Sequence, residues 1–163
     1  MRVKQTGFSL IELLVVVAVI LIVAAMAIPN LLRSRMAANE ASAVASLRSI
    51  NTSQAVYQTT FGPGYANALT ELSDGGTPAN CQPPTPPAAT SSCLIDAALA
   101  SGTKSGYAFT YVPVTSGAAV TSYSVTGDPI SAGGTGQRHF FTDQSLVIRA
   151  NTLAVATAAD PPI

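Results

Sequence analysis

The pattern of apolar and polar positions divides the chain into stretches of different periodicity. The first is an apolar run of 21 residues, 8–28, in which Glu12 is the single charged residue. A helix of this length would rise about 31 Å at about 1.5 Å per residue, which matches a bilayer hydrocarbon core of roughly 30 Å. The run therefore predicts a membrane-spanning helix.

The second stretch, residues 29–60, has the period of an amphipathic helix. Apolar side chains recur about every 3.5 residues, and most of the charged residues lie off that stripe. The stripe consists of Leu32, Met36, Ala43, Leu47, Ile50 and Tyr57. Pro29 is expected to kink the helix, because proline removes a backbone hydrogen bond and clashes with the preceding turn. We predict that the helix continues past this kink and packs its stripe against the protein's own sheet.

Residues 61–104 are punctuated by glycine and proline and show no regular period, which predicts loops with a short helix at 94–100. Cys81 and Cys93 flank a segment with four prolines. A disulfide between them is the favoured interpretation, and two free thiols in a reducing compartment are the alternative. A metal site is not predicted, because the spacing fits no zinc pattern and the chain has one histidine.

In the last stretch, residues 105–163, the apolar period changes to two, the period of strands. Four short strands are predicted, at 107–113, 120–125, 137–142 and 146–149. Strands joined by short turns form an antiparallel meander, and one of its faces needs a cover. The predicted fold class is therefore α+β, with a long N-terminal helix, half transmembrane and half amphipathic, packed on a C-terminal antiparallel sheet. The tail, 154–163, is rich in Ala, Thr and Pro and is predicted to be loose.

Composition and charge limit the classes of function. The 163 residues suffice for one domain and a membrane segment, and a hydrophobic content of 48% with 10% charged residues is too apolar for a disordered chain. Lys and Arg number 8 against 8 Asp and Glu, so the formal net charge is zero. Without Arg2 and Lys4 the balance is 6 basic against 8 acidic side chains, or −2. Binding to nucleic acid is not predicted, because it requires a basic patch.

The sequence offers no convincing active site, so we predict that the protein is not an enzyme and holds no cofactor. His139 is the only histidine, and a serine–histidine–aspartate arrangement would depend on it alone. The glycine-rich segment 133–136 precedes a predicted strand, whereas a phosphate loop precedes a helix. Asp128, Asp143 and Asp160 are candidate calcium ligands near the end of the sheet, but they lack the spacing of a calcium loop, and turns explain them.

Glu12 is the most informative single residue of the apolar run. A carboxylate within the hydrocarbon raises the free energy of insertion by about 2.5–3.5 kcal/mol, so leucine would insert better there. One interpretation is that Glu12 reaches the headgroups less than one turn away, and the other is that a partner supplies a cation. A cleaved secretory signal does not fit, because the apolar run is too long and the small residue, Gly7, lies before it.

A basic leader is followed by segment 7–12, Gly-Phe-Ser-Leu-Ile-Glu, which resembles the cleavage and methylation motif of type IV pilins and of the pseudopilins of type II secretion. The resemblance implies that a prepilin peptidase cuts between Gly7 and Phe8 and methylates the new terminal amine of Phe8. It also implies that Glu12 takes part in subunit assembly by pairing with the terminal amine of a neighbouring subunit. Pro29 lies where this family commonly has a helix-kinking proline. The order of long helix, variable loop and antiparallel sheet is likewise that of the family.

The resemblance implies a division of the chain into five parts. These are a cleaved basic leader, 1–7; a transmembrane and filament-core helix, 8–28; an amphipathic helix half, 29–60; a loop region with Cys81 and Cys93, 61–104; and a sheet with a C-terminal tail, 105–163. The implied function is that of a structural subunit of a type IV pilus-like filament, polymerised through its N-terminal helix. Its implied partners are other copies of itself, related minor subunits, the prepilin peptidase, an inner-membrane assembly platform and the lipid bilayer.

The basic flank of Arg2 and Lys4 is expected to stay in the cytoplasm, which makes the chain a single-pass inner-membrane protein with a periplasmic C-terminal domain. After assembly it would lie in an extracellular pilus or in a periplasmic filament. Two alternatives stay open on the sequence. One is a pseudopilin of a type II protein secretion system, and the other is a monomeric membrane-anchored binding domain that presents its loop to a ligand.

Overall fold

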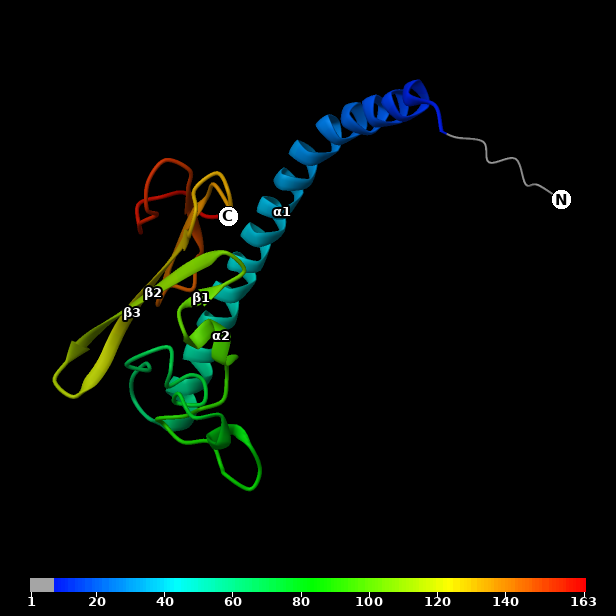
Figure 1. Ribbon diagram of the computed structural model, residues 1–163. Helices are drawn as coiled ribbons and strands as arrows, with labels where there is room; N and C mark the ends of the chain where they lie inside the picture. Colours follow the sequence, from blue (N-terminus) through cyan, green and yellow to red (C-terminus); the bar gives the residue numbers. More distant parts are fainter. Residues whose placement is uncertain (1–7) are drawn as a thin grey trace. The chain divides into compact units, whose positions relative to one another are not determined.

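The computed structural model describes residues 8–163, and its main element is one long helix, α1 (Leu10–Phe61) (Figure 1). The helix contains both predicted halves and is uninterrupted at Pro29, whose kink stays a prediction. It ends directly before a Gly-Pro-Gly segment, which breaks the helical pattern. The chain forms two compact units, one ending at Arg35 and the other beginning at Met36.

In the first unit, α1 is exposed and apolar on every side. The large side chains from Leu10 to Leu32 each expose about half of their surface or more. This part of the helix is long and apolar enough to cross a membrane, and none of it is buried inside the protein. A helix that is hydrophobic all round needs an apolar environment, either lipid or other helices.

In the second unit, α1 packs one face against the antiparallel sheet, as predicted. Ala43, Leu47, Ile50 and Tyr57 of the predicted stripe all belong to the hydrophobic core. The strands contribute the largest fully buried side chains, Tyr107, Tyr123 and Phe140. The stripe prediction is wrong at its beginning, because Leu32 is 53% exposed and lies in the first unit.

The buried face of α1 also carries two amides that the apolar stripe did not predict, Asn51 and Gln54. Asn51 Nδ2 donates to Thr142 Oγ1 at 2.8 Å, and Asn51 Oδ1 accepts from the Tyr123 hydroxyl at 3.1 Å. Gln54 Nε2 donates to the Tyr111 hydroxyl at 2.9 Å. These hydrogen bonds offset the desolvation of the buried polar groups. They also fix the position of the helix along the sheet, because each amide meets a particular strand residue.

The sheet has five antiparallel strands in the order β1-β2-β3-β4-β5, so the predicted meander is confirmed. The strands are β1 (Thr103–Lys104), β2 (Tyr107–Ser116), β3 (Ala119–Pro129), β4 (His139–Asp143) and β5 (Arg149–Asn151). The prediction of a strand at 146–149 is wrong, because β5 begins only at Arg149. Leu146 has a φ of 63°, in the left-handed region, and so it cannot belong to an extended strand.

Two short helices lie in the connection between α1 and the sheet, the 3-10 helix η1 (Pro78–Cys81) and the α-helix α2 (Ala97–Ala100). α2 begins three residues later than the predicted helix, 94–100. The reason is Asp96, which has extended backbone and whose side chain accepts a hydrogen bond from Leu99 N at 2.9 Å. Asp96 therefore caps the helix instead of continuing it.

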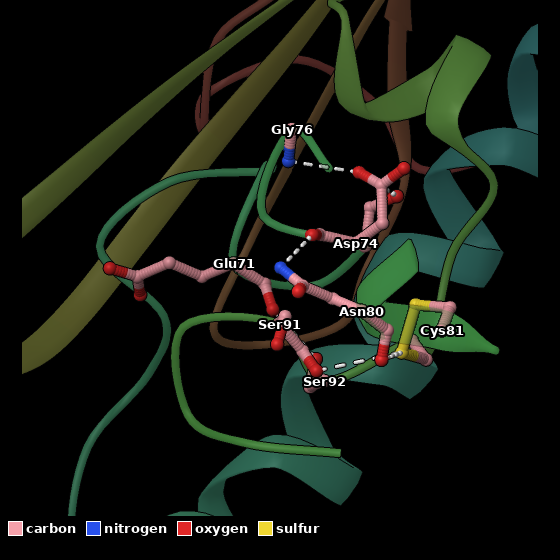
Figure 2. Close-up of a disulfide and its surroundings, with 9 residues drawn as sticks. Glu71, Asp74, Gly76, Asn80, Cys81, Ser91 and Ser92 are labelled. Carbon is pink, nitrogen blue, oxygen red and sulfur yellow. Dashed lines mark hydrogen bonds between the residues drawn. A yellow bond between two sulfur atoms is a disulfide. The ribbon is translucent and has the colours of Figure 1, made fainter. Parts of the chain in front are cut away.

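The predicted disulfide between Cys81 and Cys93 is present (Figure 2). The residues at each end of the bridge are hydrogen-bonded to the turn at Ser73 and Asp74. Asn80 Nδ2, next to the first cysteine, donates to Asp74 O at 2.9 Å, and Cys93 N donates to Ser73 O at 2.9 Å. Between the cysteines, residues 82–90 are all exposed, whereas Ser91 and Ser92 are buried. The bridge thus closes an exposed proline-rich loop at its base.

The C-terminal tail folds against β5, so the prediction that it is loose is wrong. Ala150 N donates to Pro161 O at 3.2 Å, and Ile163 N donates to Ile148 O at 3.0 Å. Ala156 is fully buried. Backbone hydrogen bonds of this kind leave no pattern of side chains in the sequence. The tail covers the edge of the sheet at β5.

Candidate functional site

The start of α1 holds the residues on which the sequence prediction centres. Gly7, on the leader side of the predicted cleavage point, lies outside the described residues. Phe8 exposes 79% of its side chain, and Ser9 directly precedes the first helical residue, Leu10. Ser9 N donates a hydrogen bond to Glu12 Oε2 at 2.9 Å. The carboxylate therefore folds back over the beginning of its own helix.

Ser9 and Glu12 form one half of a capping box. In this motif the side chain of the third helical residue accepts a hydrogen bond from the backbone N–H of the N-cap residue. The first N–H groups of a helix have no partner within it, and such groups are costly in hydrocarbon. The sequence signal for this role is Ser-x-x-Glu before an apolar run, and the sequence prediction missed it.

The surroundings of Glu12 are apolar. Its side chain lies in a shallow hollow lined by Phe8, Ile11, Val15 and Val16. The ion pairs within residues 8–163 do not include Glu12, and the bond from Ser9 is the one that the structure gives its carboxylate. In this part of the chain, Glu12 Oε1 is therefore an acceptor that has no donor.

The three aspartates considered as calcium ligands do not come together. Asp128 Oδ1 lies 2.6 Å from Nδ1 of His139, on the neighbouring strand. Asp143 and Asp160 each accept a hydrogen bond from a backbone N–H of their own turn. Within residues 8–163 no three side chains of metal-binding type form a group.

Two comparisons bear on the N-terminal segment. A family model described as the prokaryotic N-terminal methylation motif matches residues 2–28, which include Gly7, Phe8 and Glu12. The type IV wide pilus major component PilA4 of Thermus thermophilus is 45% identical to this chain over 76 residues. The chain is similar to type IV pilins over these residues. The predicted resemblance to type IV pilins is thereby confirmed.

The similarity to PilA4 spans 45% of this chain and 58% of the relative, less than two thirds of the relative's length. No solved structure matches the chain. The sheet and its connections, which belong to the unit beginning at Met36, lie beyond the matched motif.

Proposed function

We propose that this protein is a type IV pilin, the structural subunit of a type IV pilus-like filament. In this proposal it enters the inner membrane as a prepilin, is cleaved after Gly7, is N-methylated at Phe8 and polymerises through its N-terminal helix. The observation that carries the proposal is the exposed apolar start of α1, with Glu12 half-satisfied in the middle of apolar side chains. An anchor alone needs only the apolar surface, and the carboxylate makes such an anchor worse.

The charge of Glu12 suits a partner that brings its own amine. Cleavage after Gly7 would make the nitrogen of Phe8 a terminal ammonium group, one turn from Glu12 along the chain. An amine and a carboxylate that are each buried alone are strongly disfavoured by desolvation, and pairing offsets part of this cost. Glu12 Oε1 has no donor among the described residues, so it can accept from the Phe8 amine of a neighbouring copy while Oε2 keeps the Ser9 N–H.

The apolar side chains of α1 suit both environments that the proposal requires. In the monomer they face lipid, and in the filament they pack against the same segment of other copies. The hydrophobic effect does not drive association of helices that are already in lipid, because lipid tails are as apolar as the side chains. Dispersion and close packing drive it instead. The buried pair at Glu12 would then select the axial position of each incoming copy.

The proposal includes a set of partners and a location. The partners are other copies of the chain, related minor subunits, the prepilin peptidase, an assembly platform in the inner membrane and the bilayer itself. The monomer is a single-pass inner-membrane protein whose C-terminal domain lies in the periplasm, and the assembled form is an extracellular pilus. The role is structural and has no catalytic step. The name of PilA4, a major pilus component, supports this assignment.

Substitution of Glu12 tests the proposal. Glu12→Val removes the carboxylate, and Glu12→Gln keeps an oxygen for the Ser9 N–H but removes the charge. Both variants are expected to insert and to be cleaved, as shown by membrane fractionation and by an intact mass that starts at Phe8 with one methyl group. Both are expected to lower the yield of filaments in electron micrographs at least tenfold, because the pair with the amine is lost.

The control is Ile20→Val, a small apolar change elsewhere in the run, which is expected to keep filaments. Normal filaments from Glu12→Val would contradict the pairing with the amine. An intact Met1 on the mature wild-type chain would contradict the cleavage.

A further inference from the structure

The two edges of the sheet are protected to different degrees. At β5 the C-terminal tail covers the edge. At the other end, β1 pairs only with Tyr107 and Ala108 of β2. From Tyr111 to Ser116, β2 makes backbone hydrogen bonds on its β3 side alone, among the described residues. This part of β2 is an open edge.

The orientation of the backbone along this open edge follows from one hydrogen bond. Phe109 N donates to Gly102 O at 2.7 Å, so the N–H and C=O of Phe109 point away from β3. Because these groups alternate along a strand, those of Tyr111, Pro113 and Thr115 also point outward. Pro113 therefore stands at the middle of the open edge, and its missing N–H faces outward. The proline therefore removes no hydrogen bond between β2 and β3.

The open edge lacks the charges that commonly protect an edge strand. No Lys, Arg, Asp or Glu occurs between Lys104 and Asp128. Next to the edge, Val112 and Val114 expose 50% and 53% of their side chains. A long, uncharged edge with exposed aliphatic residues is a template for a further strand. A shift of register between Val114 and Thr115 adds some irregularity near the tip of the hairpin.

We infer that Pro113 blocks the open edge of β2 against the addition of another β-strand, and in particular against the same strand of a second copy. An antiparallel pair of two such edges would be centred on Pro113 of both copies. Each copy would lack the central N–H donor, and the two rings would occupy the space where the strands meet. This inference is independent of the proposed filament, since it concerns the sheet alone.

The inference is tested by measuring self-association of the full chain under conditions in which the N-terminal helices of two copies are kept apart. The chain is placed in lipid nanodiscs at one copy per disc, and pairing of discs is measured by analytical ultracentrifugation. Pro113→Thr restores the donor with a residue that favours strands. This variant is expected to pair at a concentration at least tenfold lower than wild type, and the amide of Thr115 is expected to exchange more slowly in the pairs.

Two further variants separate the edge from a general effect of losing a proline. Pro113→Lys restores the donor but places like charges opposite each other, so its discs are expected to stay single. Pro87→Thr, in the exposed loop closed by the disulfide, is expected to behave as wild type. Discs of a folded Pro113→Thr chain that stay single, or pairing by Pro87→Thr to the same extent, would overturn the inference. If Pro113→Thr does not fold, Pro113→Ala replaces it, and unchanged association of that variant overturns the inference.

Discussion

Glu40 and its neighbour Asn39, whose Nδ2 donates to Thr135 O at 2.9 Å, hold the connection between β3 and β4 to α1. Glu40 Oε1 accepts from Gln137 N at 2.9 Å, and Glu40 Oε2 accepts from Arg138 Nε at 2.7 Å. Burial by itself raises the pKa of this carboxyl, but the hydrogen bonds from Gln137 and Arg138 outweigh it, and the pKa lies below its usual value. Two neighbouring side chains of the helix thereby fix a loop that is almost 100 residues away in sequence.

The lowered pKa of Glu40 predicts a loss of stability in acid. A carboxyl whose pKa is lower in the folded state stabilises the fold above its unfolded pKa, and this contribution is lost as the pH falls through the folded pKa. The free energy of unfolding of the wild type is therefore expected to fall below about pH 4.5, measured by urea denaturation in detergent. Glu40→Gln is expected to lower stability by about 1–2 kcal/mol near pH 7 and to weaken the acid dependence. An equal slope in both proteins would contradict this role.

Glu12 shows how far a single residue can be interpreted from sequence. A charge in an apolar run raises a question of function at once, because an apolar side chain such as leucine would insert better there. The structure adds that Glu12 serves the helix it belongs to, through the N–H of Ser9. The Ser-x-x-Glu signature of this hydrogen bond is present in the sequence, although the sequence prediction did not include it.

At the scale of elements, the parts with a strong period were predictable and those held by the backbone were not. The buried stripe of α1 from Ala43 follows from the helical period of its apolar side chains, and the pairing of β2 with β3 follows from the period of two in the strands. β1 was missed, because two residues are too few for a period. Asn51 was missed because its burial depends on partners that come from β3 and β4, far along the chain.

The disulfide stabilises the connection between α1 and the sheet, and its removal is expected to cause a limited loss of stability. Replacing both Cys81 and Cys93 by serine is expected to lower the free energy of unfolding by up to about 3 kcal/mol, the estimate for a loop of this size. The effect should be local. Ser92 N donates to Glu71 O at 2.8 Å, and Leu94 N donates to Leu72 O at 2.7 Å. Neither hydrogen bond requires the disulfide.

Hydrogen exchange followed by mass spectrometry checks the locality of this effect. In the double serine variant, peptides that cover Asn80 and the exposed loop 82–90 are expected to exchange faster than in wild type. The amide of Leu94 is expected to stay protected. Equal loss of protection at Leu94 would show that the bridge holds the whole connection instead of the base of one loop.

At the scale of the whole molecule, the chain assigns different physical tasks to its two units. In the unit ending at Arg35, the helix from Leu10 to Ile28 is apolar apart from Glu12, which caps the beginning of that helix, and this surface suits the proposed contacts with lipid and with other copies. The unit beginning at Met36 has a core, buried amides and a disulfide, and the N-terminal end of that unit is part of the same helix. Sequence alone placed the site in the first unit, because its motif is local. The covered and open edges of the sheet depend on contacts between distant segments, and they needed the structure.

In the proposed filament, Glu12 of one copy meets the terminal amine of Phe8 of another. Wild type and Ile20→Val are co-expressed, so that their N-terminal peptides differ in mass. Filaments are treated with a carbodiimide, which joins a carboxylate directly to an amine, and the linked peptides are identified by mass spectrometry. Links of mixed mass between Phe8 and Glu12 are expected in filaments, and none are expected in detergent-dispersed monomers. Intact filaments that yield no mixed-mass link between these two residues would contradict this pairing.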